Sequence, residues 1–499
     1  MYLGIDCGTQ STKALLWCPE RGVTFRASVR YGLIEGLPAG HKEQHPQTWI
    51  EALEGCLSAL VAAGAQLGAV RGIGVSGQQH GAVVLDDADE PIRAAKLWCD
   101  TSTQTQCDAI VAAAGGVESY RAAIGNDLVT GFTASKIRWL RDVEPAHYRR
   151  VASVLLPHDW LNFELTGRKT TDAGDASGTG YFDVRNRAWS DAALAWLDPD
   201  RDLRPALPEV VPAGQPAGML RSSLARTWGM RPDVVVSSGS GDNMMAALGA
   251  GCVRPGRVVM SLGTSGTVFA CAPTPVIDPA GEISAFCDAT GHWLPLGCTM
   301  NVTVATEMVR QVTMGGVDLP AFEAAVASVP PGSDGLMLLP YLEGERLPNL
   351  PDGTGVYLGM RPATASPAHM ARAAMEGATI GLNRALTALV RLLPAAPEQI
   401  VLLGGGAGSE TWRQIVADVT ELPVVRPTAE EGPALGAALQ AAWTHLGGGI
   451  ESICADAVGI DETSRRTPVR SYAAHREAFE MASDALTERG FFAAHRRLL

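Results

Sequence analysis

The chain has 499 residues, 46% of them hydrophobic and 19% charged, which is typical of a folded globular protein. It is too long for one ordinary core, so we expect at least two domains. The formal net charge of −13 argues against nucleic-acid or anionic-membrane partners, and no apolar run reaches the ~18 residues typical of a membrane span.

Short apolar runs separated by glycine turns predict β-strands at the start of the chain: "YLGIDC", "KALLWC" and "VTFRASVRYGL". After "HPQTW", apolar residues at helical spacing predict a helix; they are Trp49, Leu53, Leu57, Leu60 and Val61. Strands and helices then alternate through "SVLLPHDW", "DVVVSSGSGDN", "VVMSLGTSGTVFA" and "IVLLGGGAG". This alternation predicts an α/β fold, and the small-residue segment 241–256, which ends in a Pro/Gly turn, predicts a domain junction.

A short repeat relates the two halves of the sequence. "DCGTQST" at residues 6–12 is echoed by "SLGTSGT" at residues 261–267, each between two apolar runs. Two halves that each offer such a hairpin suggest a duplicated domain whose copies face one another across a cleft. Backbone N–H groups in these turns can bind an anion such as phosphate. Two coincidental hairpin turns are the alternative.

Two aspartates adjoin these glycine-rich turns. Asp6 interrupts an apolar run, and burying a carboxylate costs several kcal/mol unless it is paired or binds a metal. Asp242 follows a strand and a glycine loop, "SGSGDN", and a plain helix N-cap is the alternative interpretation. On the functional interpretation, the two carboxylates face one another from the two sides of a cleft. One would lie near the Mg²⁺ of a nucleotide, and the other would accept the proton of an attacking hydroxyl.

A third glycine-rich segment, "VLLGGGAG" at residues 401–408, follows an apolar strand and precedes a helix that we expect to start near Ser409. Glycines there would let the backbone lie against an adenine or a ribose, and an ordinary strand-to-helix turn is the alternative. The sequence contains no GxxxxGK[ST] motif, and no GxGxxG follows the first strand, which argues against P-loop and Rossmann sites.

The two hairpins, "GDN" and "GGGA", in this order, resemble the FGGY family of carbohydrate kinases, within the actin/Hsp70/sugar-kinase superfamily. Residues 131–142, "GFTASKIRWLRD", and residues 355–377, "GVYLGMRPATASPAHMARAAMEG", resemble the two signatures of the family. The resemblance extends over about residues 1–445. It implies two ribonuclease-H-like (actin-like ATPase) α/β domains with a catalytic cleft between them, and the use of ATP and Mg²⁺.

The same resemblance implies a division into residues 1–243, with the sugar site and first phosphate loop, and residues 244–499, with the ATP site and a terminal helix from about residue 468. The loop "SGQQHG" at residues 76–81 resembles members of the family that phosphorylate D-xylulose on its terminal hydroxyl. The implied partners are this small sugar and ATP in the cytoplasm, with no nucleic acid or membrane. Whether the chain forms a homodimer stays open.

The resemblance also implies roles for individual residues. Asp242 matches the catalytic base, and Asp6 matches the carboxylate near the metal and the phosphates. The implied substrate-binding residues are Gln79, His80, Trp98, Asp100, Asp242 and Asn243. The implied nucleotide-binding residues are Gly8, Thr9, Gln10, Ser11 and Lys13 in the first hairpin, Gly263, Thr264 and Ser265 in the second, and Gly405, Gly406 and Ala407 in the adenosine loop. Lys13 could equally be a solvated strand end.

Three positions depart from the family pattern: His45, Cys99 and Ser135. Cys99, in "LWCDTST", makes the identity of the sugar less secure than the type of reaction. A kinase for L-xylulose, D-ribulose or D-arabinitol therefore stays an alternative. The alternative from another class is an actin- or Hsp70-like ATPase that acts on a protein partner.

Several conspicuous residues favour a structural interpretation. We expect Trp17, Trp49 and Trp139 in the core, and His158 and Asp159 to cap the helix "WLNFELTG". His41 and His45 alone are poor evidence of a metal site. The ten cysteines are scattered without CxxC or zinc-type spacing, which favours free thiols in a reducing cytoplasm.

Overall fold

The computed structural model describes residues 1–429 and 432–498. These residues form two compact units: unit 1 comprises 1–254, 271–294 and 432–459, and unit 2 comprises 255–270, 295–429 and 460–498. Both units are discontinuous in sequence. They differ from a single division between residues 243 and 244 chiefly in two segments, 271–294 and 432–459, which belong to unit 1.

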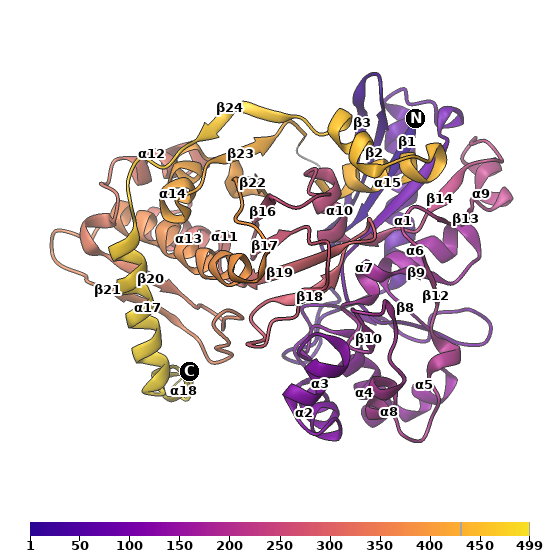
Figure 1. Ribbon diagram of the computed structural model, residues 1–499, viewed down its shortest axis with the longest axis horizontal. Helices are drawn as coiled ribbons and strands as arrows, with labels where there is room; N and C mark the ends of the chain where they lie inside the picture. Colours follow the sequence, from indigo (N-terminus) through magenta and orange to yellow (C-terminus); the bar gives the residue numbers. More distant parts are fainter. Residues whose placement is uncertain (430–431, 499) are drawn as a thin grey trace. The chain divides into compact units, whose positions relative to one another are not determined.

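The sheet of unit 1 has the strand order β13-β14-β5-β1-β2-β3, with β15 pairing on β5. Figure 1 labels β1, β2, β3, β13 and β14 of this sheet. Its strands are β1 (Tyr2–Cys7), β2 (Ser11–Cys18), β3 (Gly22–Arg30), β5 (Gly72–Gly77), β13 (Pro216–Met219), β14 (Val235–Ser237) and β15 (Ser240–Gly241). Strand β1 is antiparallel to β2 and parallel to β5, and β5 is parallel to β14 and β15.

The other elements of unit 1 surround this sheet. Its helices are α1 (Pro46–Ala62), α2 (Gln104–Ala113), α3 (Val117–Ile124), α4 (Thr133–Val143), α5 (Pro145–Arg150), α6 (Pro157–Thr166), α7 (Ala173–Ala176), α8 (Asp191–Leu197), α9 (Ser222–Thr227), α10 (Asp242–Gly249), α15 (Gly432–Leu446) and α16 (Ile450–Ala457). Its short strands are β4 (Glu43–Gln44), β6 (Val83–Leu85), β7 (Ala95–Lys96), β8 (Ser153–Leu155), β9 (Thr170–Asp172), β10 (Phe182–Asp183), β11 (Ala188–Trp189), β12 (Glu209–Val211) and β18 (Ser284–Cys287).

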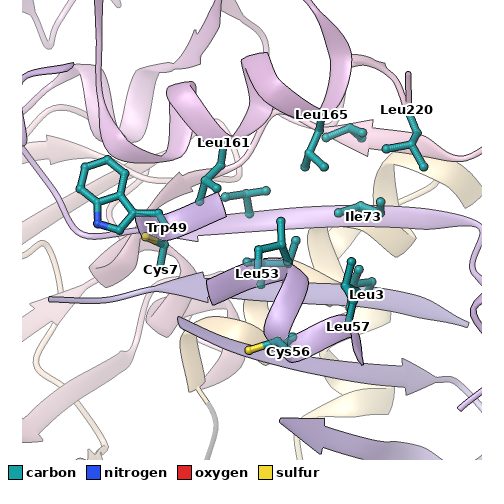
Figure 2. Close-up of a cluster of buried hydrophobic side chains, with 14 of the residues drawn as sticks. Leu3, Cys7, Trp49, Leu53, Cys56, Leu57, Ile73, Leu161, Leu165 and Leu220 are labelled. Atoms are coloured by element: carbon teal, nitrogen blue, oxygen red, sulfur yellow. The ribbon is translucent and has the colours of Figure 1, made fainter. Parts of the chain in front are cut away.

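The main core of unit 1 lies between the sheet and two helices. Figure 2 shows Leu53 and Leu57 of α1 and Leu161 of α6 gathered with side chains of the sheet such as Leu3 and Ile73. The helix predicted after "HPQTW" is α1. Trp49, Leu53, Leu57 and Leu60 are buried as the helical spacing predicts, whereas Val61 is 52% exposed. Trp17, Trp49 and Trp139 are all buried, which confirms the structural interpretation of these tryptophans.

The sheet of unit 2 repeats the same topology. Its strands are β16 (Arg257–Leu262), β17 (Gly266–Ala270), β19 (Trp293–Thr299), β22 (Gln399–Leu403), β23 (Val424–Pro427) and β24 (Ile460–Arg466), which lie in the order β19-β17-β16-β22-β23-β24. Strand β16 is antiparallel to β17 and parallel to β22, as β1 is to β2 and β5. The two Gly-Thr hairpins therefore occupy equivalent places in two related sheets, which the repeat in the sequence predicts.

Helices α13 (Pro367–Leu392) and α14 (Glu410–Thr420) pack against the second sheet. The other helices of unit 2 are α11 (Thr303–Met314), α12 (Leu319–Ala327), α17 (Ala473–Glu488) and α18 (Phe491–Arg496). A two-stranded sheet, β20 (Met337–Pro340) and β21 (Gly355–Leu358), lies beside α13. The terminal helix that the sequence predicts is α17, which contacts β20 and α13 (Figure 1).

Helix α15 comes from the far end of the sequence and packs against β1 and β5 of unit 1. Its backbone approaches the strands closely at two glycines: a Cβ at Gly4 would lie 1.9 Å from the carbonyl oxygen of Ala434, and one at Gly74 would lie 1.9 Å from that of Ala437. Side chains at these strand positions would push the helix away, because backbone atoms cannot yield as a flexible side chain can. The glycines of β1 and β5 therefore allow helix α15, residues 432–446, to pack directly on the first sheet.

Two expectations from composition can be compared with the structure. Within residues 1–429 and 432–498, no helix is both long enough and apolar enough to cross a membrane. None of the ten cysteines forms a disulfide bond, which confirms the prediction of free thiols, and eight of the ten are buried.

Candidate active site

Three chain segments with predicted site residues meet at one edge of the sheet in unit 1. Strands β1, β5 and β15 run parallel, so their carboxyl ends lie side by side. Asp6 and Ser240 are both register partners of Ser76, one on either side of β5. The Ser76 hydroxyl donates a hydrogen bond of 2.8 Å to Asp6 Oδ1. Burial of the Asp6 carboxylate raises its pKa, while the Ser76 hydrogen bond and the charge of Lys13 act in the opposite direction.

Asp242 is the first residue of α10, and the N-cap position belongs to Gly241. The interpretation of Asp242 as a plain N-cap is therefore wrong. Burial, followed by the charges of Asp6 and Asp175, raises the pKa of Asp242 to about 7. The two aspartates act on one another within unit 1, so the expectation that they come from opposite sides of a cleft is also wrong. The short strand β15 is the reason, since it places Asp242 at the end of the first sheet.

The amide side chains next to Asp242 form a connected chain of hydrogen bonds. Asn243 Nδ2 donates to Asp242 Oδ1 at 3.0 Å and to Gln79 Oε1 at 2.9 Å. Gln79 Nε2 in turn lies 3.4 Å from the sulfur of Met244. The structure thus brings together three residues that the resemblance assigned to sugar binding, from the end of β5 and the start of α10.

His80 has a strained backbone that several contacts hold in place. Its φ of 64° is in the left-handed region, which is unfavourable for a residue with a side chain. Its carbonyl oxygen accepts hydrogen bonds from Lys136 Nζ at 3.0 Å and Thr133 Oγ1 at 3.2 Å, and its backbone N–H donates to Asp175. Lys136, in the first family signature, is buried in α4, and burial lowers its pKa to about 7. These contacts fix the conformation of the loop after β5.

A buried cluster of charged residues, which the sequence did not predict, adjoins this loop through Asp175. His158 is 0% exposed; its Nδ1 lies 2.6 Å from Asp175 Oδ2, and its Nε2 lies 3.1 Å from Asp159 Oδ1 and 3.8 Å from Asp172 Oδ1. Desolvation lowers the pKa of His158, but the three carboxylates outweigh it and raise the pKa to about 9. The imidazole therefore carries a positive charge at neutral pH.

This charged cluster is hydrogen-bonded to the loop that holds His80 and to the strand that precedes Asp242. Asp175 accepts the His80 N–H, and Asp172 Oδ2 accepts a hydrogen bond of 2.8 Å from Ser240, two residues before Asp242. Asp159 Oδ2 accepts the backbone N–H of Leu156 at 2.8 Å, which confirms its predicted capping role, whereas His158 has a different one. The signal in the sequence was the pair of segments "PHDW" and "TDAGDASG", in which titratable residues stand among apolar and small residues; the structure buries nearly all of them.

The first hairpin uses part of its hydrogen-bonding capacity internally. Gly8 N–H donates to Ser11 O at 3.0 Å, which closes the turn. Trp98 Nε1 donates to Thr9 Oγ1 at 2.9 Å, and the Thr9 hydroxyl donates to Gln78 Oε1 at 3.0 Å. The Thr9 hydroxyl proton is therefore engaged, and the backbone is left as the donor at this position. The side chains of Gln10 and Lys13 are exposed.

Asp100 lies in a separate ionic cluster. Its carboxylate accepts from Lys96 Nζ at 3.0 Å, from the Ser102 hydroxyl at 2.6 Å and from the Lys42 N–H at 2.9 Å. Burial acts to raise the pKa of Asp100, but these hydrogen bonds and the Lys96 charge outweigh it and lower the pKa. Lys96 also lies 4.1 Å from the ring centroid of Trp139. These contacts hold the Asp100 carboxylate against Lys96 and the Lys42 backbone.

The predicted nucleotide segments of unit 2 lie at the ends of β16 and β22. The carbonyl groups of Gly263 and Thr264 accept backbone hydrogen bonds from Thr303 and Val302 at the start of α11, and Ser265 completes this turn. Gly404 has a φ of 85°, and a Cβ there would lie 2.6 Å from the carbonyl oxygen of Leu262, so glycine is required. Gly405, Gly406 and Ala407 form a single helical turn, and Ser409 caps α14 as the sequence predicts.

The comparisons with known proteins cover both units. Residues 1–249 match the N-terminal domain, and residues 258–445 the C-terminal domain, of the FGGY family of carbohydrate kinases. A xylulose kinase of Haemophilus influenzae is 39% identical over 474 residues, which are 94% of this chain and 95% of that protein. A xylulose kinase of Escherichia coli is 35% identical and covers 88% of this chain and 89% of its own length.

The fold agrees with these matches. The crystal structure of a xylulose kinase from Rhodospirillum rubrum has a TM-score of 0.87, a sequence identity of 26% and a coverage of 99% of both chains. The predicted α/β fold with two domains of the actin-like ATPase type is therefore confirmed.

Proposed function

The chain belongs to the FGGY family of carbohydrate kinases, and from this we propose that it transfers the γ-phosphoryl group of ATP to the terminal hydroxyl of D-xylulose, forming D-xylulose 5-phosphate. The relatives that are named xylulose kinases and match most of the chain support this substrate. Family membership over both units leaves an ATPase that acts on a protein partner without support.

One observation carries the proposal: Asn243 joins the Gln79 amide to the Asp242 carboxylate at the edge where β5 and β15 end. Amides offer both donors and acceptors, so such a group can bind neighbouring hydroxyls of a sugar. We assign Gln79, His80, Trp98 and Asn243 to sugar binding. Asp100 supports the sugar site indirectly, because it holds the Lys96 ammonium group and the Lys42 backbone in place.

Asp242 accepts the proton of the attacking hydroxyl in this mechanism. A pKa of about 7 makes it a stronger base than an ordinary aspartate, while it is still largely ionised in the upper part of the physiological range. The charge of Asp6 contributes to this basicity. Phosphoryl transfer proceeds through a loose transition state, so holding the hydroxyl in line with the phosphorus matters as much as removing its proton.

The two hairpins and the glycine loop serve the nucleotide. We assign the backbone of Gly8, Thr9, Gln10 and Ser11 and that of Gly263, Thr264 and Ser265 to the phosphates. Gly405, Gly406 and Ala407 are assigned to adenosine, at the end of a strand that occupies the place of β5 in the second sheet. Lys13 is exposed, so any phosphate contact of its side chain depends on the bound nucleotide.

The carboxylates fit a magnesium ion. Both Asp6 and Asp242 offer hard oxygen ligands, and their mutual repulsion would be relieved by a cation. Asp6 would hold Mg²⁺, which when bound supplies positive charge to the nucleotide phosphates.

A panel of acceptors tests the proposed substrate. We expect ADP release with ATP to be fastest with D-xylulose, slower with L-xylulose, D-ribulose and D-arabinitol, and close to background with water alone. The product should carry its phosphate on the terminal carbon, which NMR can establish. A higher kcat/KM for one of the other three sugars would reassign the substrate and leave the carbohydrate-kinase activity intact. If none of the four sugars stimulated ATP turnover, the result would contradict both the proposed substrate and the carbohydrate-kinase activity.

The pKa of Asp242 predicts a pH dependence. Below about pH 7 the carboxylate becomes protonated and cannot accept the hydroxyl proton, so kcat/KM for the sugar should fall as the pH decreases. The measurement is a steady-state profile over about pH 5–9, with circular dichroism at each pH as the control for folding. A profile that stays flat down to about pH 5 would contradict the assignment of Asp242 as the base.

A further inference from the structure

Three side chains of types that bind metals come together in unit 1, in a part of the chain that the kinase mechanism does not use. Cys271 directly follows β17, and Asp288 and His292 flank the turn between β18 and β19. Backbone hydrogen bonds of 2.8 and 2.9 Å between Ala272 and Trp293 hold Cys271 beside this turn. One ligand atom from each of the three side chains lies within 4.8 Å of the other two.

The spacing and the donor types suit a tetrahedral ion. Zinc bonds of about 2.0–2.3 Å to nitrogen, oxygen and sulfur place the ligand atoms roughly 3.3–3.8 Å apart, so small side-chain adjustments would complete the site. Cys271 is 2% exposed and Asp288 is 4% exposed, while His292 is partly exposed and leaves a path from solvent. Three protein ligands leave the fourth position for a water molecule.

The Thr290 hydroxyl contacts two of the three side chains, Asp288 and His292, and orients them. Its hydroxyl donates its single proton to Asp288 Oδ2 at 2.6 Å, and the same oxygen lies 3.0 Å from His292 Nδ1. The hydroxyl can therefore only accept from Nδ1–H, which leaves Nε2 of the neutral imidazole unprotonated. Partners of this kind orient metal ligands and fix their tautomer.

The charges around Cys271 also favour a cation. Burial is the main cause of a raised pKa of the Cys271 thiol, and the ionisable groups that raise it further, Asp288, Cys252 and Glu451, are all acids. Arg187 reaches the same turn, but it binds the carbonyl groups of Gly291 and His292 and stacks on the Trp293 ring.

A second group of similar composition, His41, Glu43 and Asp100, shows the contrast. There the ammonium group of Lys96 already lies within 3.2 Å of all three side chains and serves as their cation. Cys271 is instead surrounded by acidic groups, with no lysine among the charges of described residues that act on its thiol. It is therefore the better candidate for a metal site than the group around Lys96.

We propose that Cys271, Asp288 and His292 bind a borderline-soft divalent cation of the zinc class, independently of the Mg²⁺ that accompanies ATP. The Cys271 thiol loses its proton to solvent as the metal–sulfur bond forms, and a thiolate ligand selects zinc over magnesium. The chain enters this part of unit 1 after Ala270 and leaves it after Leu294, so the ion would cross-link the two ends of the segment.

Cobalt binding to the full-length protein tests the proposal. After treatment with a chelator, titration with Co²⁺ should give one equivalent per chain, with a near-ultraviolet thiolate-to-cobalt charge-transfer band that one equivalent of Zn²⁺ abolishes. Cys271→Ser should remove the band. His292→Gln should lower the affinity for Zn²⁺ by more than the ~10–100-fold typical of losing a supporting partner of a ligand. Cys107→Ser, which alters an equally buried cysteine elsewhere in unit 1, should bind as the wild type does.

Two results would overturn the proposal. One is the absence of the charge-transfer band in the wild-type protein. The other is stoichiometric binding that Cys271→Ser and His292→Gln leave unchanged, which would place the metal elsewhere. Circular dichroism checks the folding of each variant. If Cys271→Ser does not fold, His292→Gln decides the outcome, because its side chain is partly exposed.

Discussion

Replacing Asp242 by asparagine is expected to lower kcat by about 10²–10⁴-fold, the range typical of losing a general base. Asparagine has nearly the same shape and can keep the contact with the Asn243 amide, but it cannot accept the proton of the sugar hydroxyl. KM for both substrates should change much less, since Gln79, His80 and the hairpins remain. Steady-state kinetics with D-xylulose, together with calorimetric titration of the sugar and the nucleotide, would separate the two effects.

The matched control for this variant is Asp87→Asn, which removes one carboxylate from an exposed turn of the same unit. Its kcat should equal that of the wild type. Near-normal turnover by Asp242→Asn would remove Asp242 from the mechanism. A loss of turnover accompanied by an equal loss of sugar affinity would instead indicate that Asp242 acts in binding.

The second large effect is expected on stability. In His158→Gln, the carboxylates of Asp159, Asp172 and Asp175 lose the only charge partner that the structure gives all three among its described residues. Breaking a buried charge group in this way typically costs about 3–5 kcal/mol. Urea unfolding followed by circular dichroism should therefore show a clearly lower midpoint for this variant than for the wild-type protein.

The pH dependence and a surface control sharpen this result. The pKa of His158 is about 9 in the folded protein and about 6.5 when unperturbed, so its stabilising charge is fully present below about pH 6.5 and is lost as the pH rises through about 9. The gap between wild type and variant should narrow accordingly. His147→Gln removes a partly exposed histidine that pairs with Glu144, and should cost about 1 kcal/mol or less. Equal midpoints for wild type and His158→Gln would show that the buried charges do not depend on this imidazole.

The hairpins, one helix start and two site residues were predicted from short local sequence patterns. The hairpin at Gly8, its counterpart at Gly263 and the capped helix after Ser409 lie where glycine and hydroxyl residues interrupt apolar runs. Gln79 and Asp242 were predicted as site residues, and the parallel pairing of β5 and β15 brings them together.

What the sequence did not reveal depends on long-range packing. His158 and Asp175 are 17 positions apart, and their pairing follows only from the placement of α6 against α7. The internal use of the Thr9 hydroxyl depends on Trp98, 89 positions away. The predicted domain boundary after residue 243 did not include residues 432–459 in the first unit. They belong to it because α15 packs closely against glycines of β1 and β5. Residue types alone do not encode such contacts.

The packing of α15 against β1 and β5 also has a consequence for the order in which the protein is made. A ribosome completes the seven strands of the first sheet by residue 241, but the helix that covers β1 and β5 ends at Leu446. Until then, one face of the nascent sheet lacks its natural cover, and exposed apolar surface of this kind favours aggregation during synthesis. The first sheet therefore completes its packing only after residues 432–446 have been synthesised, so its folding cannot finish with the first half of the chain alone.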